Sequence, residues 1–238
     1  MDIKIKYSYD GSKFYGLQRQ KDKITVQGEI ERILLTVFNE KINLISSGRT
    51  DTNVHAIEQV SNFSISKNIP LSAIKTQLNK SLYGKIKINE IEYCNNFNSR
   101  FDAKSRTYVY YLRYEENISP FEANYITSIK TNIDIEKVNE KLSLFIGEHD
   151  FLMFSKKDKE SKNTVRTIYG AYIKQVNDNF VINIKGNSFL RSMVRMITAS
   201  CLYETKQEII DKLNLKSNKK FKKILQPNGL YLKEVSYD

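Results

Sequence analysis

The chain of 238 residues carries 38 Lys and Arg against 27 Asp and Glu, a formal net charge of +11, and is 40% hydrophobic. This apolar content can fill a core, which excludes a disordered tail. No apolar run approaches the roughly 20 residues that span a bilayer, and residues 1–6 alternate in polarity without the apolar stretch of a signal peptide. We therefore expect a globular protein of the cytoplasm with no membrane partner.

Cysteine and histidine are scarce. Cys94 and Cys201 lie far apart with no Cys-x-x-Cys spacing, and the two histidines are His55 and His149. This pattern excludes a disulfide framework and argues against a zinc site.

The excess positive charge indicates a polyanionic partner, because basic residues release the counterions condensed on nucleic acid. The charge is dispersed, with local clusters at residues 156–159 and 219–223. Fifteen Tyr and twelve Phe offer flat surfaces for base stacking. An AT-rich genome that over-uses Lys, Asn, Ile and Tyr codons explains the same composition, so charge alone leaves both explanations open.

The first half of the chain predicts alternating strands and helices. Residues 4–9 form a strand that enters a turn at Asp10, and Thr25 caps a helix with an apolar stripe from Val26 to Phe38. Further segments complete this half: a strand at 42–46, a strand at 54–65, a helix at 72–79 after Pro70, and a strand at 85–93.

The second half repeats this order. Residues 107–114 are dense in β-branched and aromatic side chains and predict a strand. Asp134 caps a helix that Gly147 closes, and strands at 167–174 and 179–184 precede a helix at 188–204. We infer two similar α+β modules that divide near residues 98–105: an N-terminal module, 1–102, and a C-terminal module, 103–238.

Residues 48–55, Gly-Arg-Thr-Asp-Thr-Asn-Val-His, connect two predicted strands, where a sheet can present a loop to a ligand. Gly48 permits a sharp turn, and Asn53 accepts a positive φ. Asp51 stands close to Arg49 and should stay ionised, which suits a nucleophile or a general base. Without further signals, an ordinary polar turn explains the same residues.

Six motifs in order resemble the TruA family of tRNA pseudouridine synthases and cover nearly the whole chain. They are Tyr9-Asp10-Gly11-Ser12-x-Phe14-x-Gly16-x-Gln18, Gly48-Arg49-Thr50-Asp51-x-x-Val54-His55-Ala56, Arg100-Phe101-Asp102-Ala103 with Arg106-x-Tyr108-x-Tyr110, Gly147-x-His149-Asp150-Phe151-x-x-Phe154, Phe189-Leu190-x-x-Met193-Val194-Arg195, and Pro227-x-Gly229-Leu230.

This resemblance implies that the protein isomerises uridine to pseudouridine at positions 38, 39 and 40 of the tRNA anticodon stem-loop. The reaction breaks the C1′–N1 bond and rejoins the base through C5, without a redox step or a leaving phosphate. It therefore needs one positioned carboxylate and neither cofactor nor metal. A TruA-like paralogue that acts on ribosomal RNA or another structured RNA is the alternative. The family also implies a homodimer whose two subunits contact one tRNA.

The resemblance assigns roles to four residues. Asp51 is the catalytic carboxylate, and Tyr108 stacks on the uridine base. Arg195 pairs with the aspartate, a role for which the guanidinium fork is suited. Arg49 fills the space that the flipped base leaves. Whether the carboxylate attacks the sugar, attacks the base or abstracts a proton stays open.

We predict an α+β protein of two ferredoxin/RRM-like modules, with antiparallel sheets joined side by side and an active-site cleft between them. Structural roles are the simpler interpretation for both histidines and for the four aromatic side chains Tyr110, Tyr114, Phe151 and Phe154. Arg191 lies four residues before Arg195 on the predicted helix and is a candidate either for a phosphate contact or for a solvated charge.

The sequence departs from the family pattern at two places. Leu17 replaces the usual Trp, and Thr52-Asn53 replaces the usual Ala-Gly after the aspartate.

Overall fold

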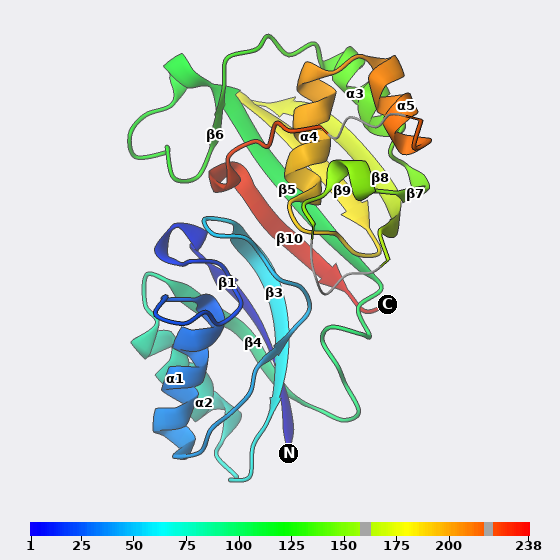
Figure 1. The fold of residues 1–238 in the computed structure, drawn as a ribbon. Helices are drawn as coiled ribbons and strands as arrows, with labels where there is room; N and C mark the ends of the chain where they lie inside the picture. The colour runs from blue at the N-terminus through cyan, green and yellow to red at the C-terminus, as the bar shows by residue number, and fades with distance from the viewer. Residues whose placement is uncertain (158–162, 217–220) are drawn as a thin grey trace. The chain divides into compact units, whose positions relative to one another are not determined.

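The computed structural model describes residues 1–157, 163–216 and 221–238, drawn in Figure 1. The chain forms two compact units: Met1–Lys104 together with Tyr231–Asp238, and Ser105–Leu230. The described residues form sheets and five α-helices, which confirms the predicted α+β class. Residues 231–238 belong to the first unit, whereas the sequence analysis assigned them to the C-terminal module.

The sheet of the first unit has β1 at its centre. Both strands that flank β1 run antiparallel to it. A short strand pairs antiparallel with one end of β3, and the C-terminal strand pairs parallel with β3 at His55 and Ala56. The strands are β1 (Asp2–Tyr9), β2 (Ile45–Ser46), β3 (His55–Ser64), β4 (Ile86–Cys94) and β10 (Leu230–Ser236).

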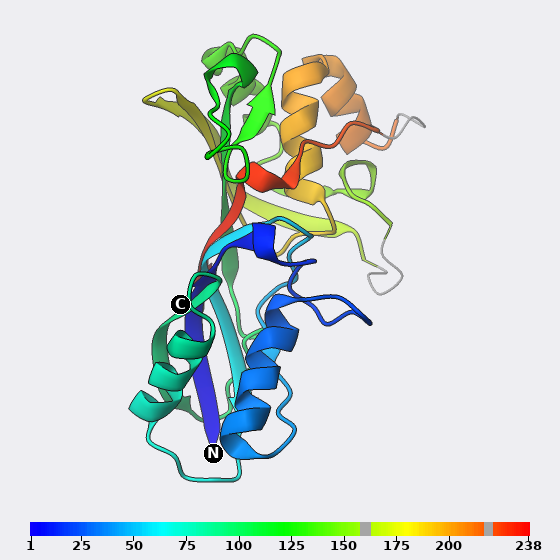
Figure 2. The ribbon, with the colours of Figure 1, turned by 90° about the vertical axis from the view of Figure 1, so that its left-hand side faces the viewer.

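Two helices, α1 (Val26–Phe38) and α2 (Leu71–Ser81), lie side by side over one face of this sheet (Figures 1 and 2). The side chain of Thr25 accepts a hydrogen bond from Gly28 N, as the predicted cap requires. Every second residue of β1 is buried, because that face of the strand meets the helices. The buried side chains of this core include Ile3, Ile5, Tyr7, Ile30, Leu34, Phe38, Ile74 and Leu78.

The sheet of the second unit contains a run of four antiparallel strands, with a short strand parallel to β5. In sheet order the four are β7 (Gly147–Asp150), β8 (Val165–Val176), β9 (Asn179–Gly186) and β5 (Ser105–Tyr114), and the short strand is β6 (Thr127–Ile129).

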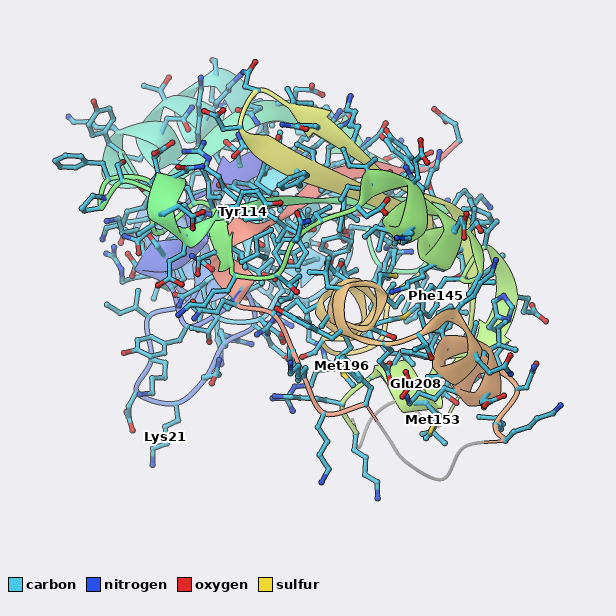
Figure 3. The ribbon with its side chains drawn as sticks, turned by 90° about the horizontal axis from the view of Figure 1, so that it is seen from above. Lys21, Tyr114, Phe145, Met153, Met196 and Glu208 are labelled. Carbon is cyan, nitrogen blue, oxygen red and sulfur yellow. The ribbon has the colours of Figure 1, made fainter. Side chains whose placement is uncertain are left out.

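Three helices belong to the second unit: α3 (Ile135–Ser143), α4 (Met193–Tyr203) and α5 (Lys206–Leu213). The first packs on β8 and on α4. Asp134 caps α3 through its side chain, as predicted. Glu208, labelled in Figure 3, completes a capping box with Thr205 at the start of α5. Along the described chain, no helix combines the length and apolarity needed to cross a membrane.

Three boundary predictions are wrong. The strand expected at 42–46 is only Ile45–Ser46. The helix expected at 188–204 begins only at Met193, because Ser192 takes a left-handed φ of 60° that interrupts helical geometry. Gly147 does not close α3, whose C-cap residue is Leu144; instead Gly147 has a φ of 107° and begins β7.

Candidate active site

The Asp51 loop, residues 47–54, connects β2 to β3 in the first unit. At its start, Ser47 N donates to Val60 O at 2.9 Å, and the Ser47 hydroxyl donates to Gln59 Oε1 at 2.6 Å. The amide of Gln59 donates in turn to Gly48 O at 3.1 Å. This end of the loop is therefore fixed to β3 by both backbone and side-chain hydrogen bonds.

The first sequence motif braces the middle of the same loop. The hydroxyl of Tyr9 and Thr50 Oγ1 are 2.8 Å apart in buried surroundings, and Leu17 N donates to Thr50 O at 3.3 Å. Gly16 has a φ of 86°, and a Cβ there would lie 2.9 Å from Thr50 O. The two motifs are therefore parts of one packed structure, a relationship that their separation in sequence does not reveal.

His55 joins these motifs at the far end of the loop. Gly11 N donates to its Nδ1 at 3.0 Å, and its ring stacks on Tyr231 with centroids 4.5 Å apart. Only 2% of the His55 surface is exposed. A Cβ on Gly11 would lie 2.2 Å from Val54 O, so this close approach requires glycine. These contacts fit the structural role expected of His55.

The tip of the loop carries the candidate carboxylate. Asp51 is half-buried, and Val54 N donates to its backbone carbonyl at 3.2 Å. Thr52 and Asn53 are exposed, and Asn53 has a φ of 62°. The expected positive φ is thus confirmed, and asparagine is among the few side chains that tolerate it. The substitution of Thr-Asn for the usual Ala-Gly consequently leaves the loop conformation accessible.

Arg49 and Gly48 lie in the first half of the same loop. Arg49 is exposed, and its Nη1 donates to Gln18 Oε1 at 3.0 Å. Gly48 does not have a positive φ, and a Cβ there would meet no atom within 4 Å. The backbone of Gly48 and its surroundings would therefore both accept a side chain, so the loop conformation does not require glycine at this position.

Tyr108 lies on β5 in the second unit and is 9% exposed. Its ring meets Phe189 edge-to-face, with centroids 5.1 Å apart. Both its position in a paired strand and this contact restrict the ring to one orientation. Tyr110, two residues further on, is fully buried, as expected for a packing residue.

Arg195 lies on α4 in the same unit and is half-buried. Its Nε donates to Leu225 O at 2.8 Å, and its guanidinium also bonds the Tyr110 hydroxyl. Burial raises the pKa of Tyr110, and its bonds to Thr127 and Arg195 oppose that rise. Tyr110 therefore supports Arg195 and is not itself poised to ionise.

The structure also places the remaining residues that the sequence motifs single out. Arg191 is exposed and precedes α4, so it does not share a helical face with Arg195. His149 Nε2 lies 3.1 Å from Ile146 O, which is a local structural contact. Phe151 and Phe154 are fully buried core residues, as expected. Of the basic clusters, residues 158–159 and 219–220 lie outside the described residues.

No group of three or more His, Cys, Asp and Glu side chains that could hold a metal ion occurs among residues 1–157, 163–216 and 221–238.

The chain matches the family model described as tRNA pseudouridine synthase over residues 5–102 and 142–238. It is 38% identical over 242 residues to tRNA pseudouridine synthase A of Borrelia turicatae, covering 99% of both chains. It is 40% identical over 247 residues to tRNA pseudouridine synthase A of Malacoplasma penetrans, covering 100% of both. The protein belongs to the tRNA pseudouridine synthase family.

Among solved structures, a chain of a Cbf5-Nop10-Gar1 complex aligns with a TM-score of 0.39 at 10% identity, covering 96% of this chain and 57% of that one. A similarity this weak has no bearing on the function.

Proposed function

We propose that the protein converts uridine to pseudouridine at positions 38, 39 and 40 of the tRNA anticodon stem-loop, with Asp51 as the catalytic carboxylate. One observation carries this proposal: a braced loop presents Asp51 in a chain that matches tRNA pseudouridine synthases over its whole length. The full-length relatives are named for tRNA, which favours tRNA over ribosomal RNA as the substrate.

The reaction explains why a single carboxylate suffices. Breaking the C1′–N1 bond leaves either an electron-deficient sugar or a covalently held one, and a carboxylate can stabilise or trap that species. The base then turns and rejoins C1′ through C5; C5 gives up its proton and N1 gains one, so the product is an isomer of the substrate. The hydrogen bonds around residues 47–50 support this role, because a carboxylate must be held in position before the bond breaks.

The uridine must leave its base stack to reach Asp51, at a cost of a few kcal/mol. We propose that Tyr108 offsets part of this cost by stacking on the flipped base. A ring held by β5 and by Phe189 loses little freedom when the base arrives, which supports the assignment.

We propose that Arg195 pairs with Asp51 in the working enzyme. The hydrogen bonds of Arg195 to Leu225 O and to the Tyr110 hydroxyl support this, because they fix the guanidinium plane. Arginine presents several donors in one plane, a geometry that matches the two oxygens of a carboxylate.

Arg49 is proposed to occupy the space left in the RNA stack by the flipped base. Its exposure at the Asp51 loop supports this assignment. Its hydrogen bond to Gln18 would have to exchange for contacts to RNA, and an exposed hydrogen bond of this kind is weak enough to do so.

Basic residues outside the loop are candidates for phosphate contacts. Lys156 N donates to Arg191 O at 3.0 Å, so two exposed cations lie on adjacent backbone segments. In the first unit, exposed Lys21 projects away from the ribbon (Figure 3). We further propose that two subunits form a homodimer around one tRNA in the cytoplasm, and the net charge of +11 favours such an extended contact.

The test is to incubate the purified full-length protein with unmodified tRNA transcripts and to map pseudouridine by chemical-adduct primer extension. The expected product lies at positions 38–40. The same mapping on RNA from a deletion strain distinguishes tRNA from ribosomal RNA as the substrate. If the modification is lost from ribosomal RNA and kept in tRNA, the enzyme acts on ribosomal RNA and not on tRNA.

A further inference from the structure

Gln59 is a buried amide that bonds to the first two residues of the Asp51 loop. It lies on β3, and none of its surface is exposed. Its Oε1 accepts from the Ser47 hydroxyl at 2.6 Å and from Val60 N at 3.1 Å, while its Nε2 donates to Gly48 O at 3.1 Å. One side chain therefore uses both its donor and its acceptor to hold the entry to the loop.

An apolar side chain at this position would make none of the hydrogen bonds that the Gln59 amide makes. The Ser47–Gln59 bond is buried, and Ser47 is only 2% exposed. Loss of the amide would leave buried polar groups without their partner, which is costly in a packed interior. We expect the backbone at Ser47 and Gly48 to shift in response, because the amide of Gln59 is a direct partner of both residues.

The chain between this clamp and the carboxylate is short. Only Arg49 and Thr50 separate Gly48 from Asp51, and Gly48 has no side chain whose packing could hold the backbone. A rotation at Gly48 would therefore displace the carboxylate unless the backbone on either side is fixed. Gln59 fixes the Gly48 carbonyl, and Tyr9 fixes Thr50 through its hydroxyl.

We propose that Gln59 is a positioning residue of the enzyme, which sets the rate of the chemical step by holding the backbone before Asp51. This inference rests on the proposed function, in which Asp51 is catalytic. It assigns Gln59 no contact with RNA, because the side chain is fully buried.

The test compares variants of the full-length enzyme under single-turnover conditions on unmodified tRNA, labelled with tritium at C5 of uridine. Gln59→Met removes the three hydrogen bonds at similar volume. Ser47→Ala removes only the Ser47 hydroxyl, and it takes the place of Gln59→Met in the comparison if Gln59→Met folds poorly. Asn79→Leu is the matched control: Asn79 also bonds through both ends of its amide, to Ile88 O at 3.1 Å and Ile88 N at 2.7 Å, but between α2 and β4.

We expect the rate of tritium release to fall about ten- to a hundredfold in Gln59→Met, since a displacement near 1 Å is enough for such a loss. The fall in Ser47→Ala should be smaller, and tRNA affinity should stay within about twofold in both. Asn79→Leu should lower the melting temperature without lowering the rate per folded molecule.

Equal rate losses in Gln59→Met and Asn79→Leu at the same folded fraction would overturn the proposal. So would a fall in the tRNA affinity of Gln59→Met that is large enough to explain its lower rate. The same measurement on Asp51→Asn separates the catalytic role of Asp51 from the positioning role of Gln59. If that variant is inactive while Gln59→Met and Ser47→Ala keep the wild-type rate, the proposed function stands and the role of Gln59 is wrong.

Discussion

The Tyr9 hydroxyl and Thr50 Oγ1 lie 2.8 Å apart in the interior of the first unit. Thr50 directly precedes Asp51 in the sequence. This contact joins the end of β1 to the loop that follows β2, across 41 residues of sequence. It explains why the opening motif and the aspartate motif occur together: the first is part of the support of the second.

Tyr9→Phe tests this support. Loss of the bond should lower the free energy of unfolding by about 0.5–1.5 kcal/mol and slow the chemical step several-fold, because Thr50 loses a buried partner. Urea unfolding and single-turnover rates measure the two effects. Tyr7→Phe is the control, since Tyr7 makes an equivalent buried bond to the Ser61 hydroxyl at 2.9 Å. If both variants lose the same activity, the Tyr9 bond has no special role in the loop.

Two glycines should differ in their tolerance of a methyl group. Gly11→Ala would place a Cβ 2.2 Å from Val54 O and should destabilise the protein by about 1–3 kcal/mol or more. Gly48→Ala meets open space and should change stability by no more than about 0.5 kcal/mol. Thermal unfolding of both variants measures the contrast, and a large loss for Gly48→Ala would contradict the described loop geometry.

Arg195→Lys should reduce activity about a hundredfold while tRNA affinity changes only a few-fold. Lysine keeps the charge but loses the planar fork that bonds Leu225 O and Tyr110. Arg32→Lys is the control, because Arg32 is exposed on α1 and pairs with Glu29 of the same helix. Single-turnover rates and filter binding distinguish the two arginines; a wild-type rate for Arg195→Lys would exclude a role that depends on the fork.

Alkaline pH should weaken the first unit through Tyr7. Burial raises the pKa of Tyr7 to about 12, above its ordinary value of 10.0 in the unfolded chain. The folded state therefore holds the phenol proton more tightly, and this contribution is complete below pH 10 and lost as the pH rises towards 12. Between pH 8 and pH 11, wild type should lose about 1 kcal/mol more stability than Tyr7→Phe, measured by urea unfolding. Equal losses would show that Tyr7 does not contribute.

Local patterns in the sequence predicted much of the fold. The Thr25 cap and the stripe ending at Phe38 gave α1 its correct limits, since both signals act within a few residues. The start of α4 was missed, because nothing local marks the left-handed conformation of Ser192. Strand β10 was also missed, and its parallel pairing with β3 depends on residues far away in sequence.

In the candidate site, too, the sequence identifies individual residues but not the contacts that support them. The motifs named Asp51, Arg49, Tyr108 and Arg195 from sequence alone, and their roles in catalysis stay predictions. The supporting residue Gln59 was not identified. Strand β3 is rich in polar residues, so its sequence does not single out Gln59, and only the pairing of the loop with β3 shows what that side chain bonds.

The central claim is that Asp51 carries out the chemistry, and Asp51→Asn tests it most directly. The substitution keeps the size of the side chain and removes its negative charge. Purified Asp51→Asn, mixed with unmodified tRNA, should bind the tRNA and form no pseudouridine at positions 38–40. Pseudouridine formed there at the wild-type rate would contradict the assignment.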